Sequence, residues 1–262
     1  MAITSTEAEV GRSSLDIDGP VARITLRNPP FNVIDVAMME ELSRSLAKIE
    51  ARQDLSIIVL SGEGKAFSVG ADVAAHTPGK VEEMLAKFHS VIRGLVATKK
   101  VTIAAVHGYC LGGGAELAMM CDMAYTTESA QWGFPEIKLG CYPPVACTAL
   151  AALVGQKRAA ELILTGRTIG GKEATEIGLA NCAAPEGELA GAVDATVAGL
   201  RALSPAALAV AKKAFYAWDS MHFDKGLARA EKIYFDELMK TSDAHEGIRA
   251  FMEKREPKWI GK

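Results

Sequence analysis

Residues 101–122 read VTIAAVHGYCLGGGAELAMMCD and combine an apolar run with a helical segment that opens in glycines. The run Val101–Val106, apolar except for Thr102, predicts a buried strand, and the pattern from about Ala115 to Cys121 predicts a helix. Backbone N–H groups at a helix N-terminus favour an anion, or a carbonyl oxygen that is gaining charge. Glycine leaves this backbone open to approach, so residues 112–114 indicate a binding turn. A tight turn that binds nothing is the alternative, and the glycines alone do not exclude it.

Outward from this stretch, strand and helix patterns alternate. Leu15–Leu26 alternates apolar and polar residues around a Gly-Pro pair and predicts a β-hairpin. A helix is predicted from Asp35, a buried strand over Ser56–Leu60, a helix over Val81–Val96, and a short strand over Met123–Thr127. This order predicts a mostly parallel α/β core.

The pattern changes after Pro143 and Pro144, where the segments are helical in composition and none is a convincing strand. The 262 residues, 49% of them hydrophobic, can bury a large core, and the length leaves one or two domains open. We therefore expect a tail over residues 1–14, an α/β core over 15–200 and a helical C-terminal region over 201–262.

Charge and cysteine content narrow the function classes. The formal net charge is −3 and basic residues are scattered, so nucleic-acid binding is not expected. Five cysteines without a C-x-x-C pair favour reduced thiols. The first 14 residues lack a targeting pattern, and the longest nearly apolar stretch, Val145–Val154, is too short for a membrane span. A cytoplasmic protein is expected.

A second loop and two carboxylates complete a candidate site. Ala66–Val73 also follows a buried strand, and two N–H groups from separate loops are what an oxyanion hole requires. The glycine run fits neither the P-loop nor the dinucleotide pattern. Glu116 lies in the first turn of the helix, where a favourable dipole contact is the simpler reading. Glu136 lies among apolar residues that could raise its pKa, and paired carboxylates beside such a hole suit addition of water or proton transfer next to a carbonyl.

These residues resemble the signature of the crotonase (enoyl-CoA hydratase/isomerase) superfamily. The resemblance covers the chain from about Leu15 to Arg255. The segments that carry it are Ala66–Asp72, Ala105–Asp122, Ala130–Gly140, Leu164–Arg167 and Ala250–Arg255.

The resemblance implies a crotonase-like α/β fold of repeated ββα units, with a helical C-terminal region that takes part in forming trimers or hexamers. It implies an acyl-CoA substrate and no metal or redox cofactor, because CoA is part of the substrate. The thioester oxygen would be held by the N–H groups of Ala71 and Gly113. Glu116 and Glu136 would correspond to the two glutamates of the hydratase branch.

Further residues are implied as substrate contacts. Ala71, Asp72, Val73 and Ala74 would run beside the pantetheine and adenine, and Phe251 and Lys254 match positions that contact the nucleotide, often from a neighbouring subunit.

The chain departs from the common family pattern after the second glutamate. Gly140-Cys-Tyr-Pro-Pro replaces a glycine-rich stretch, so Tyr142 would reshape the acyl pocket. Trp132 stands where a smaller aromatic is common, and we expect Trp132 and Tyr142 to contact the substrate and shape the acyl pocket. The Cys141–Ala146 segment is similar to hydratases of anaerobic aromatic degradation that act on cyclohexa-1,5-diene-1-carbonyl-CoA.

The sequence thus predicts an acyl-CoA hydratase of fatty-acid or aromatic-compound metabolism. A Δ3,Δ2-enoyl-CoA isomerase is the alternative enzyme, and a non-catalytic binding protein is the alternative of another class. Both carboxylates and both loops favour an enzyme. His107 is read as a hydrogen-bonded structural residue, and His76 and His89 as too isolated to bind a metal.

Overall fold

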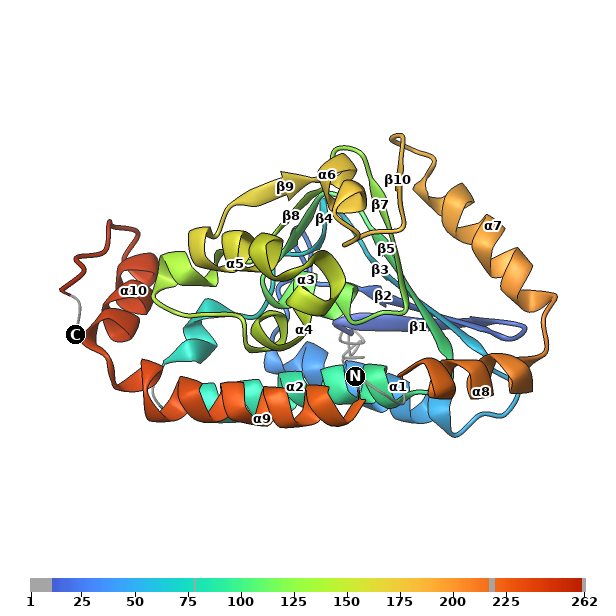
Figure 1. Cartoon of the computed structure of the whole chain (residues 1–262), viewed down its shortest axis with the longest axis horizontal. Helices are drawn as coiled ribbons and strands as arrows, with labels where there is room; N and C mark the ends of the chain where they lie inside the picture. Colours follow the sequence, from blue (N-terminus) through green and yellow to red (C-terminus); the bar gives the residue numbers. More distant parts are fainter. Residues whose placement is uncertain (1–10, 78, 217–219, 261–262) are drawn as a thin grey trace, which may run out of the picture.

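The computed structural model describes residues 11–77, 79–216 and 220–260, and its strands form two sheets (Figure 1). The larger sheet has the order β1-β2-β3-β5-β7-β10, and the smaller has the order β4-β6-β8-β9. The larger sheet contains β1 (Ser13–Asp18), β2 (Val21–Leu26), β3 (Ile57–Gly62), β5 (Val101–Val106), β7 (Met123–Thr127) and β10 (Cys182–Ala184). The smaller contains β4 (Ala66–Ser68), β6 (Tyr109–Leu111), β8 (Gln131–Gly133) and β9 (Thr168–Gly170).

The chain repeats a ββα unit, as predicted. The hairpin β1–β2 leads to α1 (Val36–Glu50), β3–β4 to α2 (Val81–Ala97), and β5–β6 to α3 (Gly113–Met119). From the second unit on, the first strand joins the larger sheet and the second joins the smaller one. In the larger sheet β2, β3, β5, β7 and β10 are parallel and only β1 is antiparallel to its neighbour. The mostly parallel α/β core is confirmed.

The apolar periodicity of α1 and α2 explains how the core forms. Asp35 caps α1 by accepting a hydrogen bond from the N–H of Met38, and the apolar face of this helix is buried. The helices α1 and α2 pack together beneath the sheets in Figure 1. On the opposite face of the larger sheet, Val193 and Val197 of α7 (Leu189–Arg201) pack against Ile57 and Ile103. Both faces of the larger sheet are therefore covered.

The prediction that no strand follows Pro143 and Pro144 is wrong. The three-residue strand β9 pairs antiparallel with β8, and β10 pairs parallel with β7. Segments this short carry no recognisable alternation, because neighbouring strands rather than their own residues define them. For the same reason β4, β6 and β8 fall in segments that were not read as strands. The helix α3 begins at Gly113, so two of the three glycines belong to its first turn.

Helices dominate the C-terminal half. Its helices are α4 (Pro144–Val154), α5 (Gln156–Thr165), α6 (Gly171–Glu176), α7, α8 (Pro205–Tyr216), α9 (Ser220–Asp236) and α10 (Ser242–Met252). Short 3₁₀ helices are η1 (Val73–His76), η2 (Pro135–Leu139) and η3 (Leu238–Lys240). In Figure 1, α9 runs along the lower edge of the molecule, where it packs on α4, and α10 lies at the far end against η1 and η2. Of the predicted tail, residues 1–10 lie outside the described part of the chain.

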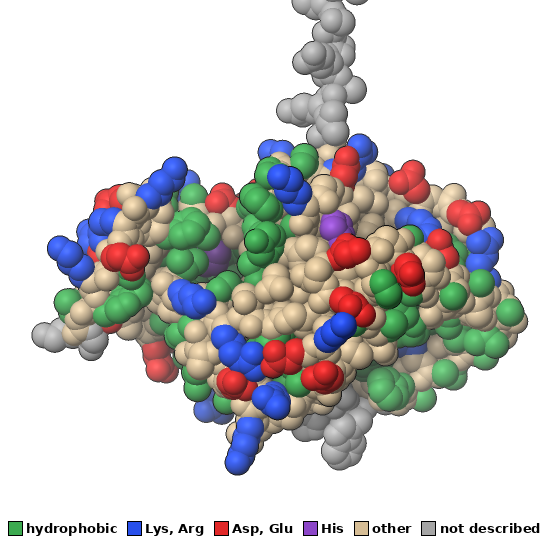
Figure 2. Space-filling model, turned by 90° about the horizontal axis from the view of Figure 1, so that it is seen from above, with side chains coloured by type: hydrophobic (Ala, Val, Ile, Leu, Met, Phe, Trp, Pro, Cys, Tyr) green, Lys and Arg blue, Asp and Glu red, His purple; other side chains and the backbone are tan. Residues whose placement is uncertain are grey.

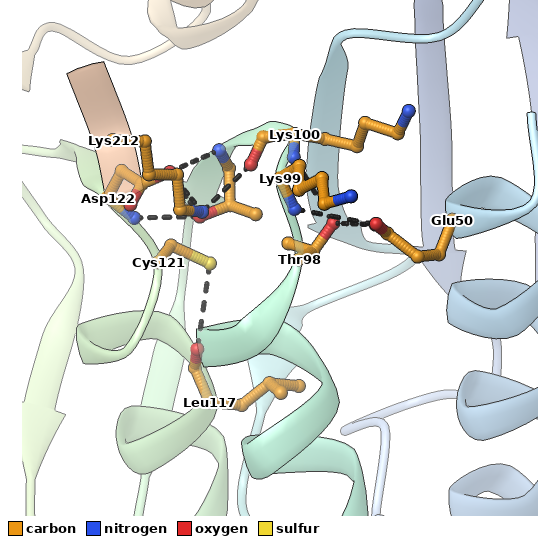
Figure 3. Close-up of polar contacts among 9 residues, drawn as sticks. Glu50, Thr98, Lys99, Lys100, Leu117, Cys121, Asp122 and Lys212 are labelled. Atoms are coloured by element: carbon orange, nitrogen blue, oxygen red, sulfur yellow. Dashed lines mark hydrogen bonds and ion pairs between the residues drawn. The ribbon is translucent and has the colours of Figure 1, made fainter. Parts of the chain in front are cut away.

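A largely buried ion pair connects α8 to the core (Figure 3). Lys212 Nζ donates to Asp122 Oδ2 and to the carbonyl oxygen of Lys100, each at 2.8 Å. The same Asp122 oxygen accepts from the N–H and the hydroxyl of Thr102 at 2.7 and 3.0 Å. Because every charge here has several partners, the pair can be buried without leaving an unsatisfied group.

Within the described residues, no single helix is long and apolar enough to cross a membrane. The helices α7 and α8 meet that criterion only as a pair, and they are bent by 106° against each other. On the face shown in Figure 2, acidic and basic side chains are interspersed and are not separated by sign.

Candidate active site

Two backbone turns from different ββα units meet at one point. A Cβ placed on Gly70 would lie 2.9 Å from the backbone nitrogen of Gly113, and one on Gly113 would lie 3.3 Å from the nitrogen of Ala71. Gly113 is the first residue of α3, so its N–H has no acceptor within the helix. The hydrogen bonds recorded for the described residues include none donated by the N–H of Ala71. Both predicted donors therefore lie side by side with their N–H groups available.

The turn at Gly70, whose φ is +95°, is held in place by hydrogen bonds to neighbouring segments. The hydroxyl of Ser68 accepts from the N–H of Gly70 at 3.0 Å and donates to the carbonyl of Asn32 at 2.7 Å. The N–H of Ile34 donates to the carbonyl of Gly70 at 2.9 Å. Asn32 is fully buried, and its side-chain nitrogen donates to the carbonyl of Ala66 at 2.8 Å. These bonds hold the Ala71 N–H in position before any ligand arrives.

Gly112 has a φ of +52°, a conformation that favours glycine. A Cβ at this position would lie only 2.7 Å from Oε1 of Glu136. The N–H of Gly112 donates to the carbonyl of Gly133 at 2.9 Å, which ties the turn to β8. The glycine is therefore required both by the backbone angle and by the approach of the Glu136 carboxyl.

Glu116 is only 2% exposed, and its carboxyl has two backbone donors. Its Oε1 accepts from the N–H groups of Val145 and Ala146, both at 2.9 Å, which belong to the first turn of α4. Burial raises the pKa of Glu116 above the usual glutamate range, while the two N–H donors oppose this shift. The N-terminus of α4 thus favours the ionised form of Glu116.

Glu136 lies on η2 and has a poorer set of partners. Its Oε2 is buried and makes no hydrogen bond. Burial, followed by the charge of Glu116, raises the pKa of Glu136 above the usual range. Two carboxyls that interact in this way hold one proton between them over a range of pH, and the geometry favours Glu136 as the protonated member.

Both carboxyls and both donor turns face one small cavity of about 80 Å³. A cavity volume of about 10–15 Å³ is enough for one water molecule, so this cavity holds a few waters or a small acyl group. Its walls come from α2, from the segment before α4, and from the two C-terminal helices. Lining residues include Val73, Met84, Leu85, Phe88, Cys141, Tyr142, Pro143, Pro144, Tyr234 and Ile248.

Of the remaining predicted site residues, some line the cavity and others lie outside it. Tyr142 lines the cavity, and its hydroxyl donates to the carbonyl of Ala230 at 2.6 Å. Asp72 caps η1 by accepting from the N–H of Ala74 at 3.0 Å, and its contact with CoA stays a prediction. Phe251 and Lys254 lie exposed at the end of α10, outside the cavity wall, and their contact with a nucleotide stays a prediction.

Trp132 does not lie where the acyl-pocket prediction places it. Its side chain is fully buried in the main core, and Nε1 donates to the hydroxyl of Thr126 at 3.0 Å. It is not among the residues that line the cavity. Its bulk fills the space between the two sheets, so its position does not support a role in shaping the acyl pocket.

Sequence reasoning missed the contribution of the C-terminal helices to the site. Tyr234 of α9 and Ile248 of α10 close the cavity from segments far from the motifs in sequence. Neither residue has a local signal, since each occupies an apolar position of an ordinary amphipathic helix.

His107 bonds through Nε2 to the carbonyl of Gly64 at 3.0 Å, as the structural interpretation predicted.

The five cysteines are free thiols, and three of them, Cys110, Cys121 and Cys141, are buried. Among the described residues, no group of three or more His, Cys, Asp or Glu side chains is arranged to hold a metal ion.

Comparison with known proteins gives one consistent result. Residues 16–262 match the family described as enoyl-CoA hydratase/isomerase. A probable enoyl-CoA hydratase of Bacillus subtilis is 37% identical, with 95% of this chain and 98% of that protein covered. The cyclohexa-1,5-dienecarbonyl-CoA hydratase of Thauera aromatica is 34% identical, with 94% and 95% covered. The crystal structure of an enoyl-CoA hydratase from Mycobacterium avium subsp. paratuberculosis is 24% identical and shares the fold, with a TM-score of 0.87 over 96% of this chain and 99% of that one.

Proposed function

The chain belongs to the enoyl-CoA hydratase/isomerase family, and from that premise we propose that it adds water reversibly to the double bond of an enoyl-CoA thioester. The observation that carries this proposal is the arrangement at the cavity. Two buried carboxyls with unequal partners face the same space as two backbone N–H groups.

The N–H groups of Ala71 and Gly113 would bind the thioester oxygen. As water adds at C3, negative charge develops on this oxygen, so donors already held in place lower the barrier more than they strengthen ground-state binding. The Gly70 N–H donates to the Ser68 hydroxyl and the Gly70 carbonyl accepts from Ile34, so the turn is already held in place when the charge appears.

The two glutamates would divide the acid and base roles. Ionised Glu116 takes a proton from the water molecule as the water oxygen bonds to C3. Protonated Glu136 gives its proton to C2 as the double bond is lost, so that H and OH are added across the bond and the pair keeps one proton. The two backbone bonds to Glu116 and the lone Oε2 of Glu136 support this assignment.

For the acyl group, we propose a short or cyclic unsaturated acid, with a cyclic dienoyl-CoA as the preferred member. The cavity is small, and the Cys141–Pro144 segment that sets this chain apart forms part of its wall. The rings of Tyr142 and Tyr234 meet edge to face at 5.1 Å there, which suits a compact hydrocarbon ring. The hydratase of Thauera aromatica, whose name states a cyclic dienoyl substrate, is consistent with this choice.

The test compares crotonyl-CoA, a long linear enoyl-CoA and cyclohexa-1,5-diene-1-carbonyl-CoA in ¹⁸O-labelled water. A hydratase yields a 3-hydroxyacyl product that carries one solvent oxygen, and the cyclic and short substrates should react fastest. An isomerase would move the double bond of a 3-enoyl-CoA without incorporating label, and a binding protein would convert none of them. Full hydration by both Glu116→Gln and Glu136→Gln would contradict the mechanism.

We also propose that the protein assembles into trimers or pairs of trimers, which the family resemblance implies. Light scattering on the purified chain would then give a mass of three or six copies, and a monomer would contradict this.

A further inference from the structure

Tyr234 is a second polar group of the cavity that has no partner. Its side chain is 1% exposed and lines the same cavity as Glu116 and Glu136. Its hydroxyl makes no hydrogen bond, just as Oε2 of Glu136 makes none. Buried polar atoms without partners are rare and destabilising, so two in one cavity indicate a ligand atom that satisfies both.

The position of Tyr234 is fixed by packing. Its ring packs edge to face on Tyr142 at 5.1 Å and on Phe235 at 5.9 Å. One helical turn earlier on α9, Glu231 accepts from Arg93 at 3.1 Å and lies 2.6 Å from Nδ1 of the buried His89. Both of these partners belong to α2, which forms the wall of the cavity. The hydroxyl is therefore held over the cavity and cannot easily turn elsewhere for a partner.

The surroundings of Tyr234 keep its hydroxyl neutral. Burial raises its pKa, and the nearby Cys141 thiol and Glu136 carboxyl raise it further. Cys141 is close enough to exert this effect, but the two groups do not reach the geometry of a normal hydrogen bond. A neutral phenol offers one donor hydrogen, so Tyr234 is suited to donate to an oxygen and not to act as a base.

We propose that the Tyr234 hydroxyl donates a hydrogen bond to the oxygen at C3 of the acyl group, first in the attacking water and then in the 3-hydroxyacyl product. This inference rests on the proposed hydratase function. The thioester oxygen already has the donors of Ala71 and Gly113, whereas the C3 oxygen must lie near the glutamates. A single oxygen that bridges Tyr234 and Oε2 of Glu136 satisfies both unpartnered atoms, which makes Tyr234 a catalytic residue.

The test uses Tyr234→Phe, which removes the hydroxyl and keeps the ring. We expect kcat for hydration of crotonyl-CoA to fall by about 10-fold or more, since a donor to the reacting oxygen is lost. Calorimetry should show weaker binding of acetoacetyl-CoA, which carries an oxygen at C3 and cannot be dehydrated, by about 5- to 20-fold. Binding of butyryl-CoA, which lacks that oxygen, should be unchanged. The Tm should not fall, because the hydroxyl makes no bond in the free protein.

Tyr125→Phe is the matched control. The Tyr125 hydroxyl bonds to Thr196 Oγ1 at 2.6 Å on the outer side of the larger sheet, away from the cavity. This variant should lower the Tm and leave kcat and both affinities unchanged. If wild-type protein hydrates the substrate and Tyr234→Phe matches it in kcat and in the ratio of the two affinities, the role of Tyr234 is refuted. If wild-type protein hydrates none of the substrates, the proposed function fails instead, and the two affinities still decide whether Tyr234 binds a C3 oxygen.

Discussion

Glu116 and Glu136 have the same chemical group and different environments. Backbone donors at the start of α4 stabilise one carboxylate, whereas the other has a buried oxygen with no partner. Hydration requires the first to be ionised and the second to be protonated. The reaction rate should therefore follow the population of this one-proton state.

A plot of kcat/KM against pH for crotonyl-CoA should be bell-shaped. It should rise as Glu116 loses its proton and fall as Glu136 loses its own. Burial raises both pKa values, so both limbs should lie above the ordinary glutamate pKa of about 4.3. The weak activity that remains in each variant should show one limb only. The profile of Glu116→Gln should lack the acidic limb, and the profile of Glu136→Gln should lack the alkaline limb. An optimum near pH 4 to 5 would contradict this account.

Gly112 tests the packing beside Glu136. In Gly112→Ala the new methyl group would clash with Oε1 of Glu136 and the residue would keep a φ that alanine disfavours. We expect about a 100-fold loss of kcat and a lower Tm, since a carboxyl displaced by even 1 Å loses its alignment. Gly191→Ala is the control, because this glycine lies in α7 with open space around it. Wild-type kinetics and stability in Gly112→Ala would show that the carboxyl does not need its present position.

The candidate site was predictable from sequence only where its residues belong to one local motif. Local patterns pointed to the two glycine-containing turns, to Glu116 in the first turn of a helix and to Glu136 among apolar residues. The choice of Ala71 and Gly113 as the two donors came from the family resemblance. Tyr234 was not predictable, because only the packing of α9 over the cavity gives it a role. Trp132 was misplaced for the opposite reason, since it lies close to Glu136 in sequence but points into the core.

At the scale of elements, a largely buried cation on α8 pairs with an acidic side chain of the core. Lys212→Ala would leave the largely buried Asp122 carboxylate without its counter-ion. Breaking such a pair costs about 3–5 kcal/mol in the free energy of unfolding, and the remaining bonds from Thr102 place the expected loss toward the lower end. Urea denaturation measures this loss. The neighbouring Lys213→Ala, an exposed position, should change stability by less than about 0.5 kcal/mol. Equal effects of the two variants would exclude a specific role for the Asp122 pair.

Length and regularity decide which elements the sequence predicts. The helix α2 runs for 17 residues with a continuous apolar face, and the six residues of β5, apolar except for Thr102, are all buried. Both were predicted within a residue of their observed ends. The strands β4, β6, β8, β9 and β10 have three residues each and exist because a neighbouring strand pairs with them. Long-range pairing of this kind cannot be seen in a local pattern.

At the scale of the whole molecule, the site is assembled from distant parts of the described chain. The two sheets supply the donor turns, α4 supplies the partners of Glu116, and α9 and α10 close the cavity. This assembly buries two glutamates in a space with few partners, so the protein as a whole carries a stability cost for its site. That cost depends on pH, because it disappears when the carboxyls are protonated in both the folded and the unfolded chain.

The stability of the whole protein should show this cost directly. The folded state raises the pKa of Glu136, so its contribution to stability is fully present below the unfolded pKa of about 4.3 and is lost as pH rises toward the folded value. Glu136→Gln, which cannot ionise, should therefore gain stability over wild type as pH rises above about 4.3, with a constant difference below that pH. Each unit of pKa shift corresponds to about 1.4 kcal/mol in the free energy of unfolding.

Urea denaturation of both proteins between pH 4 and 9 measures the difference. Arg255 and Arg249 lower the pKa of Glu246, so Glu246 adds stability as pH rises. Both proteins contain Glu246, so its contribution cancels in the difference between them. A difference that stays flat across this range would mean that Glu136 is not held in a destabilising environment, and the proton donor proposed for C2 would need to be sought elsewhere.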